Sequence, residues 1–97
     1  MNQSLDMLVL LNGLAARVKA SGIRAASSLD ELLGDTGLDS LDTVLLSVYV
    51  CEVFGIAEET GKSLVPRSFA DLVRFVEAHG KRFPASADEA FALVDGA

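Results

Sequence analysis

The sequence is poor in the residues that build disulfides, metal sites and secretion signals. Its 97 residues include one cysteine, Cys51, one histidine, His79, and no tryptophan. A single thiol cannot form an intramolecular disulfide, and one cysteine with one histidine is too few for a zinc site. The first six residues contain no lysine or arginine, so they lack the basic start of a secretory signal. We therefore expect a cytoplasmic protein that binds no metal.

Aromatic residues and long apolar runs are also scarce. Aromatic side chains make up 6% of the chain, against 51% for all hydrophobic residues. This balance favours aliphatic packing between helices over an aromatic-rich β-sandwich. No apolar run approaches the roughly 18 residues that a membrane span requires. A chain of this length fits one domain and can bury a core without covalent cross-links, so we expect a single all-α domain.

Basic residues are missing from the centre of the chain. Residues 30–59 contain eight acids and no lysine or arginine, in a chain of formal net charge −6. Nucleic-acid binding requires clustered basic residues, so this distribution argues against it. Two interpretations remain open. The acids either attract a basic protein partner, or they belong to solvated helix ends and loops.

Apolar spacing predicts a first helix from Ser4 to about Ala20. Its expected buried face consists of Leu8, Leu11, Ala15 and Val18. Ser21-Gly22 ends the pattern, and a long loop follows, with one helical turn expected at residues 29–33. A loop of this length needs anchors in a compact domain. The expected anchors are Ile23, Leu29, Leu32 and Leu33.

Two stronger helices follow the loop. One is expected from about Ser40 to Phe54, with Asp39 as its N-cap, Gly55 as its end, and Leu46, Val50, Val53 and Phe54 facing inward. The other begins at the capping box of residues 68–71 and ends before Gly80. Between them we expect a polar connector at residues 58–62, and at most a turn or short helix at residues 63–65.

The end of the chain is predicted to be an extension. A second capping box at residues 86–89 introduces a short helix that ends near Val94. We therefore place the main domain at residues 1–83 and the C-terminal extension at residues 84–97.

The sequence shows no arrangement for nucleophilic catalysis. Ser40 has no base close to it in sequence, and a serine nucleophile needs one that is held and oriented. His79 ends a helix, where surface or capping histidines are common, and Cys51 sits in an apolar run that is typical of inert thiols. We therefore expect no enzyme. Ser40 is either an ordinary serine at a helix start or a residue modified by another protein, since a helix N-terminus favours a phosphodiester.

Residues 37–44, Gly-Leu-Asp-Ser-Leu-Asp-Thr-Val, lie before an apolar helix that ends in Phe54-Gly55-Ile56. This stretch resembles the attachment region of acyl carrier proteins, and the resemblance covers residues 4–80. It implies a bundle of three main helices and a short one. It also implies that a phosphopantetheinyl transferase attaches 4'-phosphopantetheine from coenzyme A to Ser40. The thiol of this arm would carry an acyl group as a thioester.

The chain departs from the family pattern in three places. The loop before Ser40 is longer, and the segment after Gly80 extends beyond the usual end. The second helix, the main recognition element in the family, carries only Glu52 as an acid after Asp42. Leu45 and Val48 are expected on its outer side. They predict either a partner that binds by apolar contact or a patch covered by the loop or the C-terminal segment.

The resemblance implies two sets of site residues. Partner recognition is expected at Asp35, Asp39, Leu41, Asp42, Leu45, Val48 and Glu52. An acyl pocket is expected at Leu46, Val50, Phe54, Ile56, Phe69 and Val73. The implied partners are the transferase and acyl-loading, condensing or acyl-transfer enzymes of a specialised fatty-acid or polyketide-type pathway.

Two alternatives to this function stay open. Asp39 before the serine favours an acyl carrier over an aminoacyl or peptidyl carrier, in which Gly-Gly-His or Gly-Gly-Asp commonly precedes the serine. Those carriers differ only in cargo. The second alternative is an unmodified helical domain that uses its apolar faces for protein interaction.

Overall fold

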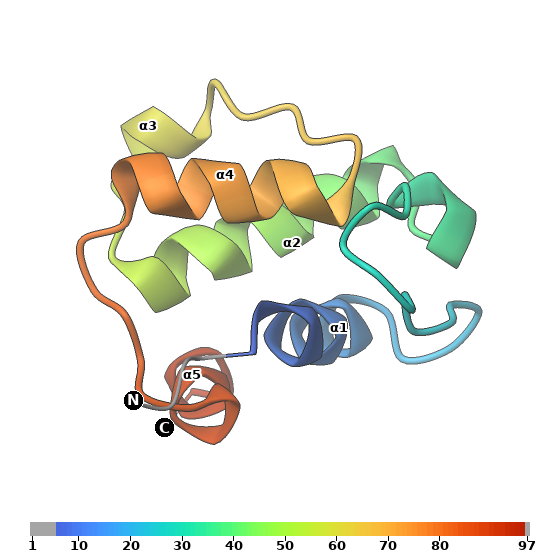
Figure 1. The fold of residues 1–97 in the computed structure, drawn as a ribbon, viewed down its shortest axis with the longest axis horizontal. Coiled ribbons are helices and arrows are strands. Elements are labelled where there is room, and N and C mark those ends of the chain that lie inside the picture. Colours follow the sequence, from blue (N-terminus) through green and yellow to red (C-terminus); the bar gives the residue numbers. More distant parts are fainter. Residues whose placement is uncertain (1–5, 97) are drawn as a thin grey trace.

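The central element of the fold is α2 (Ser40–Phe54), which contacts all four other α-helices in this computed structural model (Figure 1). The structure describes residues 6–96. The other elements are α1 (Met7–Val18), the 3-10 helix η1 (Gly34–Thr36), α3 (Glu58–Gly61), α4 (Phe69–His79) and α5 (Ala87–Val94). The described residues form no β-strand, so the prediction of an all-α bundle is confirmed.

The predicted bounds of α2 are confirmed at both ends. Asp39 is its N-cap, and Gly55 ends it in the left-handed conformation, with φ of 67°. The inward residues predicted from spacing, Leu46, Val50, Val53 and Phe54, all have no exposed surface. Burial of a Leu or Phe side chain is worth about 1.5–3 kcal/mol, so this face of α2 supplies much of the core.

The buried face of α1 differs from the predicted one. The expected start at Ser4 lies outside the described residues, and the helix ends at Val18. Its buried residues are Leu10, Leu11, Leu14 and Ala15, whereas Leu8 and Val18 are only partly buried. The reason is that α1 contacts α2, α4 and α5 together, so its neighbours, and not one stripe of spacing, decide which side is covered.

The short helix between α2 and α4 is not where the sequence indicated. Residues 58–61 are helical, and residues 63–65 are not, although the first stretch was expected to be a connector. Glu58 and Glu59 lie in the first turn of α3, where negative charge favours a helix start. Gly61 lets this turn approach α2, because a Cβ there would lie 2.8 Å from Cys51 Sγ. A helix of four mostly polar residues has no apolar pattern to detect.

The long loop between α1 and α2 is held by buried side chains and by backbone contacts. Its helical turn is η1 at Gly34–Thr36, so the expected position at 29–33 is wrong. Leu33 is buried as expected, but Leu32 is 49% exposed, which corrects its role as an anchor. Leu32 forms an isolated β-bridge with Ser68, and Leu33 N donates to Arg67 O at 2.9 Å. At Leu32, therefore, the backbone and not the side chain holds the loop.

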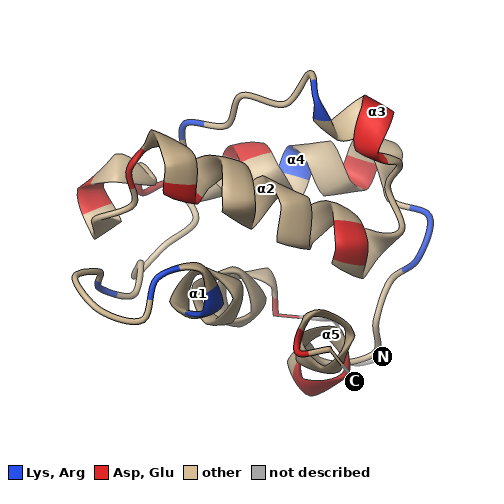
Figure 2. Cartoon of the chain, turned by 180° about the vertical axis from the view of Figure 1, so that it is seen from behind, with Lys and Arg blue, Asp and Glu red and all other residues tan. Residues whose placement is uncertain are grey.

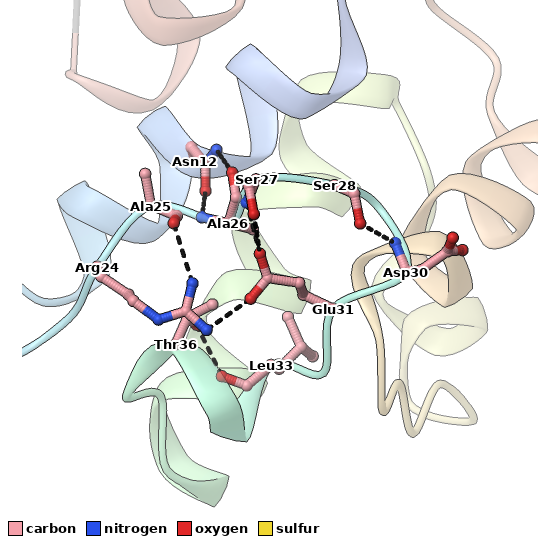
Figure 3. A network of polar contacts seen from close by, with 10 residues as sticks. All are labelled: Asn12, Arg24, Ala25, Ala26, Ser27, Ser28, Asp30, Glu31, Leu33 and Thr36. Atoms are coloured by element: carbon pink, nitrogen blue, oxygen red, sulfur yellow. Dashed lines mark hydrogen bonds and ion pairs between the residues drawn. The ribbon is translucent and has the colours of Figure 1, made fainter.

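Asn12 of α1 attaches the middle of the same loop (Figure 3). Its side-chain oxygen accepts a hydrogen bond from Ala26 N at 2.8 Å, and its amide nitrogen donates to Ala26 O at 3.0 Å. Both polar groups of the Ala26 backbone are therefore satisfied by one side chain.

The capping serines predicted for the last two helices are confirmed. Ser68 and Asp71 form a reciprocal capping box on α4, and Ser86 accepts a hydrogen bond from Glu89 N on α5. Ala90 of α5 is fully buried in the common core, and α5 contacts α1 and α2. In Figure 1, α5 accordingly lies beside α1.

The contact between α5 and α1 depends on a glycine. A Cβ at Gly13 would collide with the ring of Phe91. The guanidinium of Arg17 lies 4.1 Å from the centre of that ring and pairs with Asp95 at 2.7 Å. Gly13 weakens α1 by about 1 kcal/mol relative to alanine. In return, the missing side chain leaves room for the ring of Phe91.

We predict that Gly13→Ala destabilises the protein despite its higher helix propensity. The added methyl group must displace Phe91, which should cost about 1–3 kcal/mol. In a Phe91→Ala background the same change should stabilise the protein by up to about 1 kcal/mol. Urea unfolding of the four proteins measures both effects. Stabilisation by Gly13→Ala alone would contradict this packing.

Candidate functional site

Ser40 is an exposed residue at the first position of α2, between the two members of a capping box. Asp39 Oδ1 accepts a hydrogen bond from Asp42 N at 2.8 Å, and Asp42 Oδ2 accepts one from Asp39 N at 3.0 Å. Among the hydrogen bonds of residues 6–96, none involves the Ser40 hydroxyl. The turn around Ser40 is therefore fixed by its neighbours, and its own side chain stays available.

A glycine allows the turn before Ser40 to approach the preceding loop. Gly37 has φ of 104°, and a Cβ at this position would lie 2.5 Å from Gly22 O. Only glycine adopts such a conformation without strain and leaves room for the carbonyl group. Lys19, at the end of α1, donates a hydrogen bond to Gly37 O at 3.3 Å and lies 3.2 Å from Asp42 Oδ2.

A groove of about 790 Å³ begins beside Ser40 and follows α2. One wall is a face of α2, and the other consists of α3 and residues 62–66. Apolar side chains line much of it: Val44, Val48, Ile56, Leu64, Val65 and Pro66. Polar groups also take part, namely Thr43, Ser47, Glu52, Glu58 and Lys62. A groove of this volume can hold a flexible organic group of drug-like size.

The residues expected to form an acyl pocket lie mostly elsewhere. Of that set, only Ile56 lines the groove. Leu46, Val50, Phe54 and Phe69 are packed in the closed core with at most 1% exposed surface. Val73 is partly buried and borders a second hollow of about 370 Å³, which is also lined by Met7 and Phe83. Spacing along α2 separated inward from outward residues, but it could not separate the core from the floor of a groove.

Three groove residues of α2, Thr43, Ser47 and Cys51, had no place in the predicted site. They follow Ser40 at intervals of three or four residues, which puts them on one side of the helix. That spacing was a usable signal. What the sequence did not reveal was that residues 58–66 fold over this side of α2.

The outer side of α2 carries an apolar stripe, which we define as Leu41, Val44, Leu45 and Val48. Their exposed fractions are 66%, 58%, 42% and 51%. Neither the long loop nor α5 covers them, so the interpretation of a covered patch is wrong. In Figure 2 the middle of α2 is free of charged residues, which lie toward its ends.

The acids expected to recognise partners are not equally available. Asp35, Asp39 and Glu52 are exposed, whereas the side chain of Asp42 is only 13% exposed and pairs with Lys19. The Asp39 backbone hydrogen bond lowers the pKa of Asp42, and Lys19 adds to this shift. Asp42 therefore stabilises the turn, and little of its side chain is exposed to a partner.

Cys51 and His79 occupy ordinary structural positions. Cys51 is 8% exposed, and burial raises the pKa of its thiol, which lowers the fraction of reactive thiolate. His79 is exposed at the end of α4, with its ring centre 4.9 Å from that of Phe75.

Glu31 organises the loop that leads to the site (Figure 3). Its carboxylate pairs with Arg24 Nη2 at 2.6 Å and accepts hydrogen bonds from Ser27 N at 2.6 Å and Ser27 Oγ at 2.7 Å. The Arg24 hydrogen bond, followed by those from Ser27, lowers the pKa of Glu31 to about 2. The loop before Ser40 is thus folded around one charged side chain.

Comparisons with known proteins leave the site to be interpreted from its geometry alone. The chain matches no protein-family model, no curated protein and no solved structure. Within residues 6–96, no three metal-binding side chains are grouped as a metal site would require. No described helix has the length and apolar character needed to cross a bilayer.

We predict that the contribution of Glu31 to stability depends on pH. Because its pKa is lower in the folded state, this contribution is complete above about pH 4.5 and is lost as the pH falls toward 2. Glu31→Gln should therefore be less stable than wild type at pH 7, and the difference should shrink across this range. Urea unfolding at several pH values measures it. Glu77→Gln, at an exposed position of α4, is the matched control, and a pH-independent difference for Glu31→Gln would contradict the prediction.

Proposed function

We propose that the protein is a carrier that holds an acyl group as a thioester on a 4'-phosphopantetheine arm attached to Ser40. The observation that carries this proposal is the position of Ser40. Its exposed hydroxyl stands at the start of α2 and at one end of the apolar groove. The phosphodiester of the arm would lie at the helix N-terminus, where free N–H groups and the helix dipole favour negative charge.

The groove supports the proposal because it offers an apolar surface beside the attachment point. It runs along α2 from Ser40 to Cys51 and Glu52, which is about 17 Å at 1.5 Å per residue. A pantetheine arm is a chain of comparable length. The apolar lining suits an apolar cargo, and the open side leaves the thioester accessible to enzymes. The cargo is therefore proposed to be an acyl group of a fatty-acid or polyketide-type pathway.

The apolar stripe supports a docking role for α2. Its four residues follow the spacing of i, i+3, i+4 and i+7 and so form one continuous surface. Exposed acids flank it, with Asp35 and Asp39 before it and Glu52 after it. A second copy of the chain would bring these acids together, whereas an enzyme with an apolar contact surface and a basic rim would complement them. The proposed partners are therefore such enzymes, beginning with the transferase that must reach Ser40.

The loading reaction tests the carrier function directly. We predict that incubation with coenzyme A and a broad-specificity phosphopantetheinyl transferase adds one arm to the wild-type protein. Ser40→Ala should gain none. Ser86→Asn is the matched control, because it removes a hydroxyl at another helix start and keeps a good N-cap. Intact-protein mass spectrometry measures the gain.

The outcomes of this loading experiment separate the candidate functions. An arm on wild type and on Ser86→Asn, but not on Ser40→Ala, supports the carrier function. No gain in wild type would end the carrier proposal and leave an unmodified interaction domain as the interpretation of the stripe.

The stripe makes a separate prediction for the same enzyme. Leu45→Glu should raise the KM for the protein substrate about tenfold, because it places a charge in the apolar contact, while kcat stays nearly constant. Leu93→Glu is the matched control, since Leu93 is 39% exposed on α5 and lies outside the stripe. An unchanged KM for Leu45→Glu would show that the stripe is not the docking surface.

A further inference from the structure

Lys19 joins the end of α1 to the turn that carries Ser40. Its ammonium nitrogen lies 3.2 Å from Asp42 Oδ2 and donates a hydrogen bond to Gly37 O at 3.3 Å. The two partners stand on opposite sides of Ser40 in the sequence. Lys19 is also the C-cap residue of α1, where its N–H donates to Ala15 O, so its backbone is fixed by that helix.

The carboxylate oxygen that Lys19 contacts also fixes the backbone before Ser40. Asp42 Oδ2 accepts the hydrogen bond from Asp39 N, and the return bond runs from Asp42 N to Asp39 Oδ1. Lys19 and the Asp39 N–H therefore share one acceptor. The ammonium group therefore acts on the same carboxylate oxygen that holds the backbone of the residue next to Ser40.

Lys19 also balances charge at this turn. The capping box puts two carboxylates around Ser40, and their repulsion opposes the geometry that the hydrogen bonds favour. In the described part of the chain, the only ion pair to Asp39 or Asp42 comes from Lys19. The side chains of Lys19 and Asp42 are 36% and 13% exposed, so water only partly screens their attraction.

Attachment of the arm would increase the negative charge that Lys19 balances at this turn. Ser40 Oγ would form a bond to the phosphorus that carries the pantetheine as the pyrophosphate bond of coenzyme A breaks, so that adenosine 3',5'-bisphosphate leaves and the hydroxyl loses its proton. The resulting phosphodiester adds a negative charge beside Asp39 and Asp42. The attraction of this charge to Lys19 offsets part of its repulsion by the two carboxylates. Lys19 should therefore stabilise the modified protein more than the unmodified one.

We propose that Lys19 is a positioning residue for modification at Ser40. It holds residues 37–42 in the conformation that a transferase recognises, and it compensates the charge that arrives with the arm. This inference rests on the proposed function, because it needs attachment at Ser40.

The test measures loading of Lys19→Met and Lys19→Arg by a broad-specificity phosphopantetheinyl transferase with coenzyme A. Arg74→Met is the matched control, since Arg74 pairs with Asp71, the equivalent carboxylate in the capping box of α4. We expect Lys19→Met to lower kcat/KM for the protein substrate about fivefold, the size expected for a partly exposed ion pair. Lys19→Arg, which keeps the charge, and Arg74→Met should both have the wild-type kcat/KM.

A second measurement separates positioning from a general contribution to folding. Loading should lower the thermal midpoint Tm of Lys19→Met more than that of wild type or Arg74→Met, because the added charge is not compensated. Circular dichroism checks that each variant is folded. Lys19→Gln, which removes the charge and keeps a donor, replaces Lys19→Met if that variant does not fold, and the same loss is expected.

The outcomes distinguish the two proposals. Equal kcat/KM for wild type and the uncharged variants, or an equal change of Tm on loading, would overturn the role of Lys19 and leave the carrier intact. If the wild type gains no arm, the carrier proposal fails and the role of Lys19 fails with it.

Discussion

The reciprocal capping box between Asp39 and Asp42 is the interaction on which the site depends. It makes Asp39 the N-cap and Ser40 the first residue of α2, and it satisfies two backbone N–H groups at this end of the helix. Burial of Leu46, Val50 and Phe54, whose exposed surface is zero, fixes the rotation of α2 about its axis. A rotation by about 100°, the angle of one residue, would expose part of that face.

Three sides of α2 have different surroundings. One side builds the core, a second forms the wall of the groove from Ser40 to Cys51, and a third carries the apolar stripe. Val44 and Val48 belong to both the groove wall and the stripe. This sharing explains why α2 is apolar almost all round, a composition that a helix with a single buried face does not require. Cargo and partner are accordingly proposed to meet along one edge of α2.

The sequence predicted the elements whose ends have strong local chemistry. The caps of α2 and α4 are set by Asp39, Gly55 and Ser68, and such signals act within four residues. The turn at Ser40 could be placed for the same reason. The Ser86 cap likewise placed α5.

The missed features arise from contacts between segments that are distant in sequence. Leu32 is exposed and is held through its backbone, which pairs with Ser68. The α3 helix approaches α2 because Gly61 fits against Cys51. The groove could not be predicted because its second wall, residues 58–66, has little apolar pattern of its own. The contacts of Lys19 were equally hidden, since Gly37 and Asp42 lie 18 and 23 residues away along the chain.

Attachment of the arm to Ser40 can be tested by locating the arm within the chain. After incubation with coenzyme A and the transferase, the protein can be digested and the peptide that contains residues 37–44 fragmented in a mass spectrometer. We expect the phosphopantetheine mass on Ser40 alone. An arm on any other residue, or on none, would rule out Ser40 as the attachment point.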